Sequence, residues 1–123
     1  MDKNNSLKIL GFIVLGGLVI TAAFFAFNQK TPASANLDVF AQCLADQGAT
    51  MYGAEWCVYC KQEKKNFGDS FRLVPYVECP DNPALCTEKK IEKTPTWLFP
   101  DGRRFVGLQG LQKLSEESGC PLP

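Results

Sequence analysis

Hydrophobic and polar positions divide this chain into two unequal parts. Residues 9–27 carry no charge, and a helix of that length spans about 28 Å, close to the thickness of a bilayer core. From residue 37 onward, apolar side chains occur in short runs separated by charged, glycine and proline positions, as in a globular domain. The pattern predicts a transmembrane anchor or signal segment over residues 1–28, a linker over 29–36 and a folded domain over 37–123.

The N-terminal segment has two possible fates. Lys3 and Lys8 precede the apolar run, so the positive-inside rule predicts a cytoplasmic N-terminus. The length of the run favours an uncleaved anchor, whereas Ala33-Ser34-Ala35 offers a small-residue cleavage site, with a secreted product after cleavage behind Ala35. Both alternatives predict a domain on the extracytoplasmic side, periplasmic or extracellular.

The folded part alternates between helical and extended patterns. Apolar residues at helical spacing predict a helix that starts near Leu37 and ends before Gly48. Later segments are predicted as strand 49–53, helix 57–67, strand 73–78, helix 84–91, strands 96–99 and 104–107, and helix 111–117. Within the predicted helix 57–67, the charged residues 61 and 63–65 predict a solvated face.

The order of these elements predicts an α/β fold. A strand–helix–strand crossover makes the first two strands parallel, and the hairpin turn at Pro100–Arg103 makes the last two antiparallel. Pro75 predicts an edge position or an irregular start for the second strand. We therefore expect a small mixed four-stranded sheet with helices on both faces.

Composition narrows the possible functions. The 13 basic and 13 acidic residues cancel, and no basic stripe is present, so nucleic acid is not an expected partner. The chain has no histidine, which excludes imidazole catalysis and histidine-ligated metal sites. Six cysteines in so small a domain favour an oxidising compartment.

Cys57 and Cys60 form a Cys-x-x-Cys pair between a predicted strand and a predicted helix. At the start of a helix, unpaired N–H groups and the positive end of the helix dipole stabilise a thiolate, so Cys57 is the predicted nucleophile. Cys60, one turn further, is the predicted resolving thiol, and Trp56 would flank the exposed sulfur. A structural disulfide or half of a zinc site is the alternative interpretation.

Three segments carry a resemblance to a known family. They are Met51–Cys57 (MYGAEWC), Pro75–Cys79 (PYVEC) and Pro95–Trp97 (PTW). The Cys57-x-x-Cys60 motif after a strand, with Thr94-Pro95-Thr96 ahead of the next, resembles the thioredoxin superfamily. Within it, the three segments resemble the thioredoxin-like domain that is fused to vitamin K epoxide reductase homologues, and the similarity covers Leu37 to Pro121. Here one predicted membrane segment stands where those proteins have a membrane bundle.

The resemblance implies further features and also shows departures. It implies a cis bond between Thr94 and Pro95, with the proline beside the two sulfurs and the preceding backbone pairing with a substrate chain. Thioredoxins carry a buried aspartate where this chain has Met51, so that internal proton acceptor is absent. Val58-Tyr59 replaces the residues found between the cysteines of well-known relatives, which leaves the reduction potential open.

Four other cysteines need an interpretation. Cys79 and Cys86 flank a six-residue loop, and the fused relatives carry a cysteine pair in this region, which favours a structural disulfide. A second redox-active pair that relays electrons is an alternative, and so is zinc bound by these two together with the Cys-x-x-Cys pair. Cys43 and Cys120 then either bond to each other or stay free, since a sequence does not fix connectivity.

These observations predict a thiol–disulfide oxidoreductase that needs no cofactor or metal and oxidises cysteine pairs of exported proteins. The resemblance implies a separate quinone-linked membrane partner, similar to vitamin K epoxide reductase, that would reoxidise Cys57–Cys60. A reductase or isomerase of the same fold and a non-enzymatic, disulfide-stapled binding module are the alternatives. Glu55, predicted to face solvent beside the motif, is a candidate for proton transfer.

Overall fold

The computed structural model describes residues 32–123, with side chains described from Leu37 onward. Helix α2 (Pro32–Asp46) begins inside the segment 29–36 that was predicted as linker. Proline is favourable in the first turn of a helix and alanine propagates it, which accounts for the earlier start. The helix ends where predicted, and Gly48 adopts the left-handed φ of 73° that a residue with a Cβ would resist.

Four short strands form one mixed sheet in the order β2-β1-β3-β4. Their bounds are β1 (Thr50–Gly53), β2 (Tyr76–Glu78), β3 (Thr96–Leu98) and β4 (Arg104–Val106). Strand β1 pairs with β2 in parallel and with β3 in antiparallel orientation, and β3 pairs with β4 in antiparallel orientation. The predicted directions of both strand pairs are confirmed, and β2 lies at the edge of the sheet.

The segment between β1 and β2 differs in part from the prediction. Helix α3 (Val58–Phe67) matches it, but a 3-10 helix, η1 (Gly68–Leu73), follows directly. The predicted strand start at Leu73 is therefore wrong, and β2 begins only at Tyr76. Pro75 has no N–H for a sheet hydrogen bond, so it contributes only its carbonyl, which accepts from the backbone N–H of Met51 at 2.9 Å.

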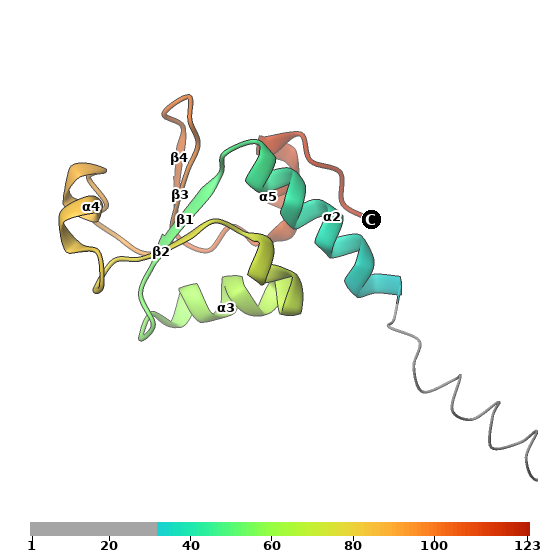
Figure 1. The fold of residues 1–123 in the computed structure, drawn as a ribbon, viewed down its shortest axis with the longest axis horizontal. Helices are drawn as coiled ribbons and strands as arrows, with labels where there is room; N and C mark the ends of the chain where they lie inside the picture. Colours follow the sequence, from blue (N-terminus) through green and yellow to red (C-terminus); the bar gives the residue numbers. More distant parts are fainter. Residues whose placement is uncertain (1–31) are drawn as a thin grey trace, which may run out of the picture. The chain divides into compact units, whose positions relative to one another are not determined.

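Two further helices complete the described residues. Helix α4 (Pro83–Glu88) is shorter than predicted, and Lys90, with a φ of 54°, lies just beyond its end. Helix α5 (Gly110–Ser118) ends at Gly119 as predicted. Figure 1 shows α4 to the left of the sheet and α2 and α5 to its right. This mixed sheet with its helices fits a thioredoxin-like fold.

Aromatic side chains from three elements make the centre of the core. The ring of Phe67 stacks on Phe40 at a centroid distance of 5.8 Å and lies 6.0 Å from Trp97. All three are buried. These contacts join α2, α3 and β3, and burial of such side chains is the main term that stabilises a small domain.

The prediction of a solvated face on α3 is wrong at Glu63. Its side chain is completely buried. One carboxylate oxygen accepts from the backbone N–H of Gln109 at 2.7 Å, and the other accepts from that of Gly110 at 2.9 Å. Buried charges need such partners. The carboxylate therefore caps the first turn of α5 and fixes it against α3, a role that a local charge pattern does not reveal.

The predicted membrane segment, over residues 9–27, lies outside the described residues, and so does the predicted linker up to residue 31. Among residues 32–123, no helix has the length and apolar character that crossing a membrane requires.

Candidate functional site

Cys57 lies at the point where the chain passes from the sheet into α3. It is the N-cap residue of that helix, in extended conformation with φ −73° and ψ 117°. Its own N–H donates to the carbonyl of Ala54 at 3.0 Å, which fixes the turn after β1. The sulfur therefore lies at the open end of the helix, where N–H groups lack partners within the helix.

The Cys57 sulfur accepts a hydrogen bond from the helix. The backbone N–H of Cys60 donates to Sγ at 3.2 Å, which is the N-cap contact usually made by an oxygen. Cys57 is partly exposed, whereas Cys60 is completely buried. The two thiols thus differ in access, as predicted: one can meet a second molecule, and the other can meet only its neighbour.

The two thiols also differ in acidity. Burial raises the pKa of Cys57, but the hydrogen bonds with Cys60, with Thr94 and with the Tyr59 backbone lower it by more, so the net shift is downward. Burial raises the pKa of Cys60 to about 11, with a contribution from the adjacent Cys57 sulfur. At neutral pH the exposed thiol is therefore the better nucleophile, and the buried thiol holds its proton.

The Thr94–Pro95 peptide bond lies beside the same sulfur. It is cis, as the family resemblance implied. The Cys57 thiol lies 3.5 Å from the carbonyl oxygen of Thr94, 37 residues away along the chain. Pro95 is fully buried. The structure thus brings Cys57, Cys60, Thr94 and Pro95 together.

An apolar surface surrounds Cys57. The exposed fractions are 71% for Trp56, 74% for Val58 and 62% for Tyr59. Single exposed apolar residues are ordinary, but here three of them flank one partly exposed thiol in the sequence. Trp56 thus stands on the predicted exposed side of the motif, and Val58 and Tyr59 add to it.

Sequence reasoning missed a pair of polar residues on β2. The Tyr76 hydroxyl donates a short hydrogen bond to one carboxylate oxygen of Glu78. The other oxygen of Glu78 accepts from the backbone N–H of Glu55 at 2.7 Å. Residues two apart on a strand share a face, so the Tyr-x-Glu spacing was the available signal. The side chain of Glu55 itself is exposed, as predicted.

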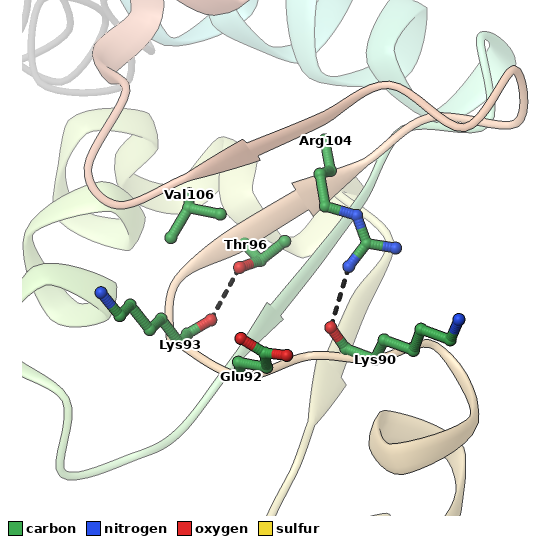
Figure 2. Close-up of a pocket in the computed structure, with 6 residues that line it drawn as sticks. All are labelled: Lys90, Glu92, Lys93, Thr96, Arg104 and Val106. Atoms are coloured by element: carbon green, nitrogen blue, oxygen red, sulfur yellow. Dashed lines mark hydrogen bonds between the residues drawn. The ribbon is translucent and has the colours of Figure 1, made fainter.

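A cavity of about 620 Å³ is lined in part by Lys93 and Thr96, the residues on either side of the Thr94–Pro95 bond (Figure 2). Within it, the Thr96 hydroxyl donates to the carbonyl of Lys93 at 2.7 Å, and the Arg104 guanidinium donates to that of Lys90 at 2.9 Å. Its lining carries more positive than negative groups and consists of Lys90, Glu92, Lys93, Thr96, Arg104 and Val106.

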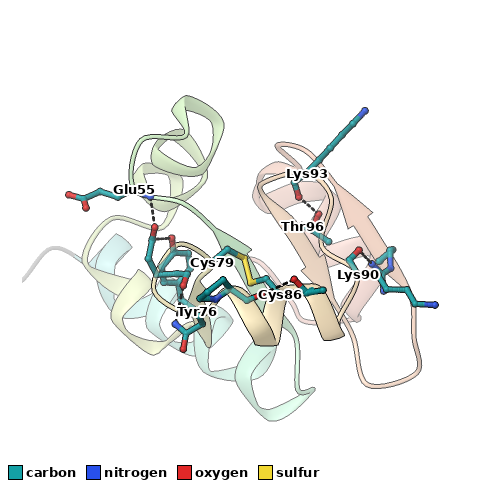
Figure 3. Close-up of a disulfide and its surroundings, with 12 residues drawn as sticks. Glu55, Tyr76, Cys79, Cys86, Lys90, Lys93 and Thr96 are labelled. Carbon is teal, nitrogen blue, oxygen red and sulfur yellow. Dashed lines mark hydrogen bonds between the residues drawn. A yellow bond between two sulfur atoms is a disulfide. The ribbon is translucent and has the colours of Figure 1, made fainter.

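The four remaining cysteines are bonded in pairs. Cys43 joins Cys120 across 77 residues, which ties α2 to the end of α5, and Cys79 joins Cys86 across 7 residues. Figure 3 shows the second bond, which joins Cys79, the residue after β2, to Cys86 in α4. The zinc alternative needed Cys79 and Cys86 as thiolates, but they are bonded to each other. Within residues 32–123, no cluster of three or more potential ligands is placed to hold a metal ion.

One comparison with known proteins bears on the general class of this protein. No protein-family model matches the chain. The chain is similar to the thiol-disulfide oxidoreductase LTO1 of Arabidopsis thaliana, with 34% identity over 112 residues. The match covers 84% of this chain but only 30% of that protein, so the chain spans less than a third of its length. A thioredoxin-like fold and a curated relative with thiol–disulfide chemistry thus point to the same class of protein, the oxidoreductases.

Proposed function

We propose that this protein is an extracytoplasmic thiol–disulfide oxidoreductase that oxidises cysteine pairs of exported proteins through Cys57 and Cys60. In the oxidised protein, a substrate thiolate attacks the Cys57 sulfur, the Cys57–Cys60 bond breaks, and Cys60 leaves as a thiolate that takes up a proton. The second substrate thiol, after losing its proton, attacks the substrate sulfur of the mixed disulfide. Cys57 then leaves as a thiolate, and the substrate carries the new disulfide.

One observation carries the proposal. Of the six cysteines, all within the described residues, only Cys57 and Cys60 are free, and they lie at the start of a helix with the outer sulfur accepting the Cys60 N–H. This arrangement stabilises the Cys57 thiolate both as nucleophile and as leaving group. The bonded pairs, in contrast, have no helix start of this kind at their sulfurs.

The surroundings support a polypeptide substrate. The apolar surface of Trp56, Val58 and Tyr59 would bind the residues that flank a substrate cysteine. The backbone of Thr94, next to the Cys57 sulfur, would pair with the substrate chain in extended form. Both contacts favour unfolded or flexible substrates, such as proteins that have just been exported.

The proposal also assigns a direction of electron flow, from substrate thiols to Cys57–Cys60. The two structural disulfides support an oxidising compartment, and Met51 leaves the site without the buried acid of thioredoxins. A quinone-linked membrane enzyme similar to vitamin K epoxide reductase would reoxidise the pair. The apolar N-terminal segment would hold both proteins at one membrane and so raise their effective concentration.

The test uses the full-length chain in its native membrane fraction. Alkylation of thiols after acid quenching should find Cys57–Cys60 mostly as a disulfide, and the purified chain should have a potential above about −200 mV. A dithiol in cells and a potential near the about −270 mV of thioredoxin would instead identify a reductase.

A variant of Cys60 distinguishes an enzyme from a non-enzymatic binding module. Replacement Cys60→Ala removes the resolving thiol, so an enzyme should accumulate mixed disulfides at Cys57 with substrate proteins. The variant Cys57→Ala/Cys60→Ala is the control and should trap none. Absence of trapped species in Cys60→Ala would show that the pair does not turn over, as in a disulfide-stapled binding module.

A further inference from the structure

Cys60 must exchange a proton in every cycle, yet it is completely buried. It leaves as a thiolate when the substrate is oxidised, and it must lose its proton again before it can close the disulfide with Cys57. This requirement rests on the exchange proposed above. Burial holds the pKa of Cys60 at about 11, so at neutral pH a thiolate forms rarely without a nearby proton acceptor.

The position of the thioredoxin acid does not supply that acceptor. Met51 is completely buried and belongs to the core. The neighbouring strand supplies polar groups instead, since Tyr76 on β2 lies directly opposite Met51 and Glu78 lies opposite Gly53. The chain therefore carries a carboxylate, that of Glu78, on the strand next to this position.

Gly53 shows how close these groups come to Cys60. A Cβ at Gly53 would stand 3.0 Å from the Tyr76 hydroxyl and 3.2 Å from the Cys60 sulfur. The hydroxyl and the sulfur thus both border the side-chain space that glycine leaves empty. A larger residue there would occupy the space between them, which gives a physical reason for glycine where no positive φ requires one.

The hydroxyl is connected onward to the surface. Tyr76 is partly buried and donates to Glu78, which is partly exposed and therefore in contact with water. The Lys64 ammonium of α3 is a further charged group at Tyr76 and lies 3.7 Å from the ring centroid. Burial and the bond to Glu78 raise the pKa of Tyr76, so the phenol stays neutral and passes protons on without ionising.

We infer that Tyr76 and Glu78 form a proton relay between Cys60 and solvent. When Cys60 attacks, its S–H bond breaks and the proton goes to the Tyr76 oxygen, while the original phenolic proton passes to the Glu78 carboxylate. The Cys60 thiolate then attacks the Cys57 sulfur of a mixed disulfide and expels the other thiolate. When Cys60 leaves as a thiolate, the same two transfers run in reverse.

Reaction of the reduced full-length chain with an equimolar aromatic disulfide, dithiobis(nitrobenzoate), tests the relay. Attack by Cys57 releases the first coloured thiolate, and attack by Cys60 on the resulting mixed disulfide releases the second. Tyr76→Phe and Glu78→Gln should each slow the second phase about tenfold or more at pH 7, within the range of general base catalysis. The first phase should change less than about twofold, because Cys57 does not use the relay.

Two control variants remove one carboxylate charge, as Glu78→Gln does, but at other positions. Asp81→Asn removes an exposed carboxylate three residues beyond Glu78 and should leave both phases unchanged. Glu55→Gln tests the rival acceptor that the sequence suggested, and it should not slow the second phase. If Glu55→Gln slows it as much as Glu78→Gln does, or if neither Tyr76→Phe nor Glu78→Gln slows it, the relay is wrong while the exchange itself stands.

The pH profile gives a readout that misfolding does not imitate. With the relay, the second phase of the unsubstituted chain should be nearly flat between about pH 6 and 8. Without it, the rate should rise about tenfold per pH unit, because it follows the thiolate fraction of Cys60. A steep profile in the unsubstituted chain overturns the relay even if the variants do not fold. A missing second phase in that chain overturns the proposed function as well.

Discussion

The six cysteines of this chain fall into two regions that use the same side chain in opposite ways. Cys57 and Cys60 are free at the start of α3, where one sulfur is exposed and accepts a helix N–H. Cys43, Cys79, Cys86 and Cys120 are bonded in pairs between segments that are separate in the sequence. The comparison teaches that chemistry here follows from position: the helix start activates a thiol, whereas links between segments constrain the chain.

The largest expected effect separates the two regions directly. Cys57→Ser should reduce thiol–disulfide exchange with a dithiol peptide to the level of buffer alone, because a serine hydroxyl does not form the nucleophile at neutral pH. Cys43→Ala/Cys120→Ala should retain exchange as long as the domain is folded. Peptide oxidation, followed by mass spectrometry under folding conditions, measures both. Loss of exchange in the folded second variant would contradict the division between the regions.

The two bonded pairs should differ in how much they stabilise the fold. In the chain-entropy model, a bond across 77 residues contributes about 4.5 kcal/mol to the free energy of unfolding, and one across 7 residues about 2.4 kcal/mol. Removing Cys43–Cys120 should therefore destabilise the protein more than removing Cys79–Cys86. Urea unfolding of the two double alanine variants measures the difference. The reverse order would show that native contacts outweigh loop closure.

Glu63 sharpens the comparison because it supports the active-site helix without a covalent bond. Glu63→Gln keeps the shape but removes the charge and turns an N–H group toward one backbone donor of α5. We expect a loss of about 2 kcal/mol in the free energy of unfolding. Urea unfolding measures it, with exposed Glu116→Gln on α5 as the matched control. Equal stability of both variants would contradict a capping role.

The smallest expected effect concerns acidity within the free pair. Each thiol becomes reactive as the pH rises through its pKa, so the alkylation rate of Cys57 in the reduced chain should reach half its maximum at a lower pH than that of an ordinary thiol, and the rate of Cys60 only near pH 11. Rate measurements with iodoacetamide, resolved by peptide mapping, distinguish them. Equal midpoints would remove the asymmetry of the site.

The shifted pKa values of Cys57 and Cys60 also predict how the stability of the reduced protein depends on pH. For Cys60 the folded pKa is the higher one, so the reduced protein should lose stability as the pH rises from the ordinary thiol range toward about 11, where the unfolded chain releases that proton first. Cys57 has the opposite sign, and its contribution falls as the pH drops through its lowered pKa. Unfolding of the reduced chain at several pH values checks both signs.

Local patterns were sufficient for most of the fold. The end of α2 before Gly48, the start of α3 at its N-cap Cys57 and the β3–β4 hairpin were all predicted, because caps, turn residues and alternation act over a few neighbouring positions. The start of β2 was not predicted correctly. The residues from Leu73 onward have an extended pattern in the sequence, but in the structure Leu73 still belongs to η1.

The sequence by itself determined that this chain carries a Cys-x-x-Cys pair at a strand-to-helix junction, and which of its two thiols lies outward. Only the tertiary structure decided which other cysteines bond, that Glu63 is buried under α5, and that Tyr76 comes close to Cys60. The reason is physical: capping and periodicity depend on adjacent residues, whereas these contacts arise where separate segments pack, and packing depends on the whole chain at once.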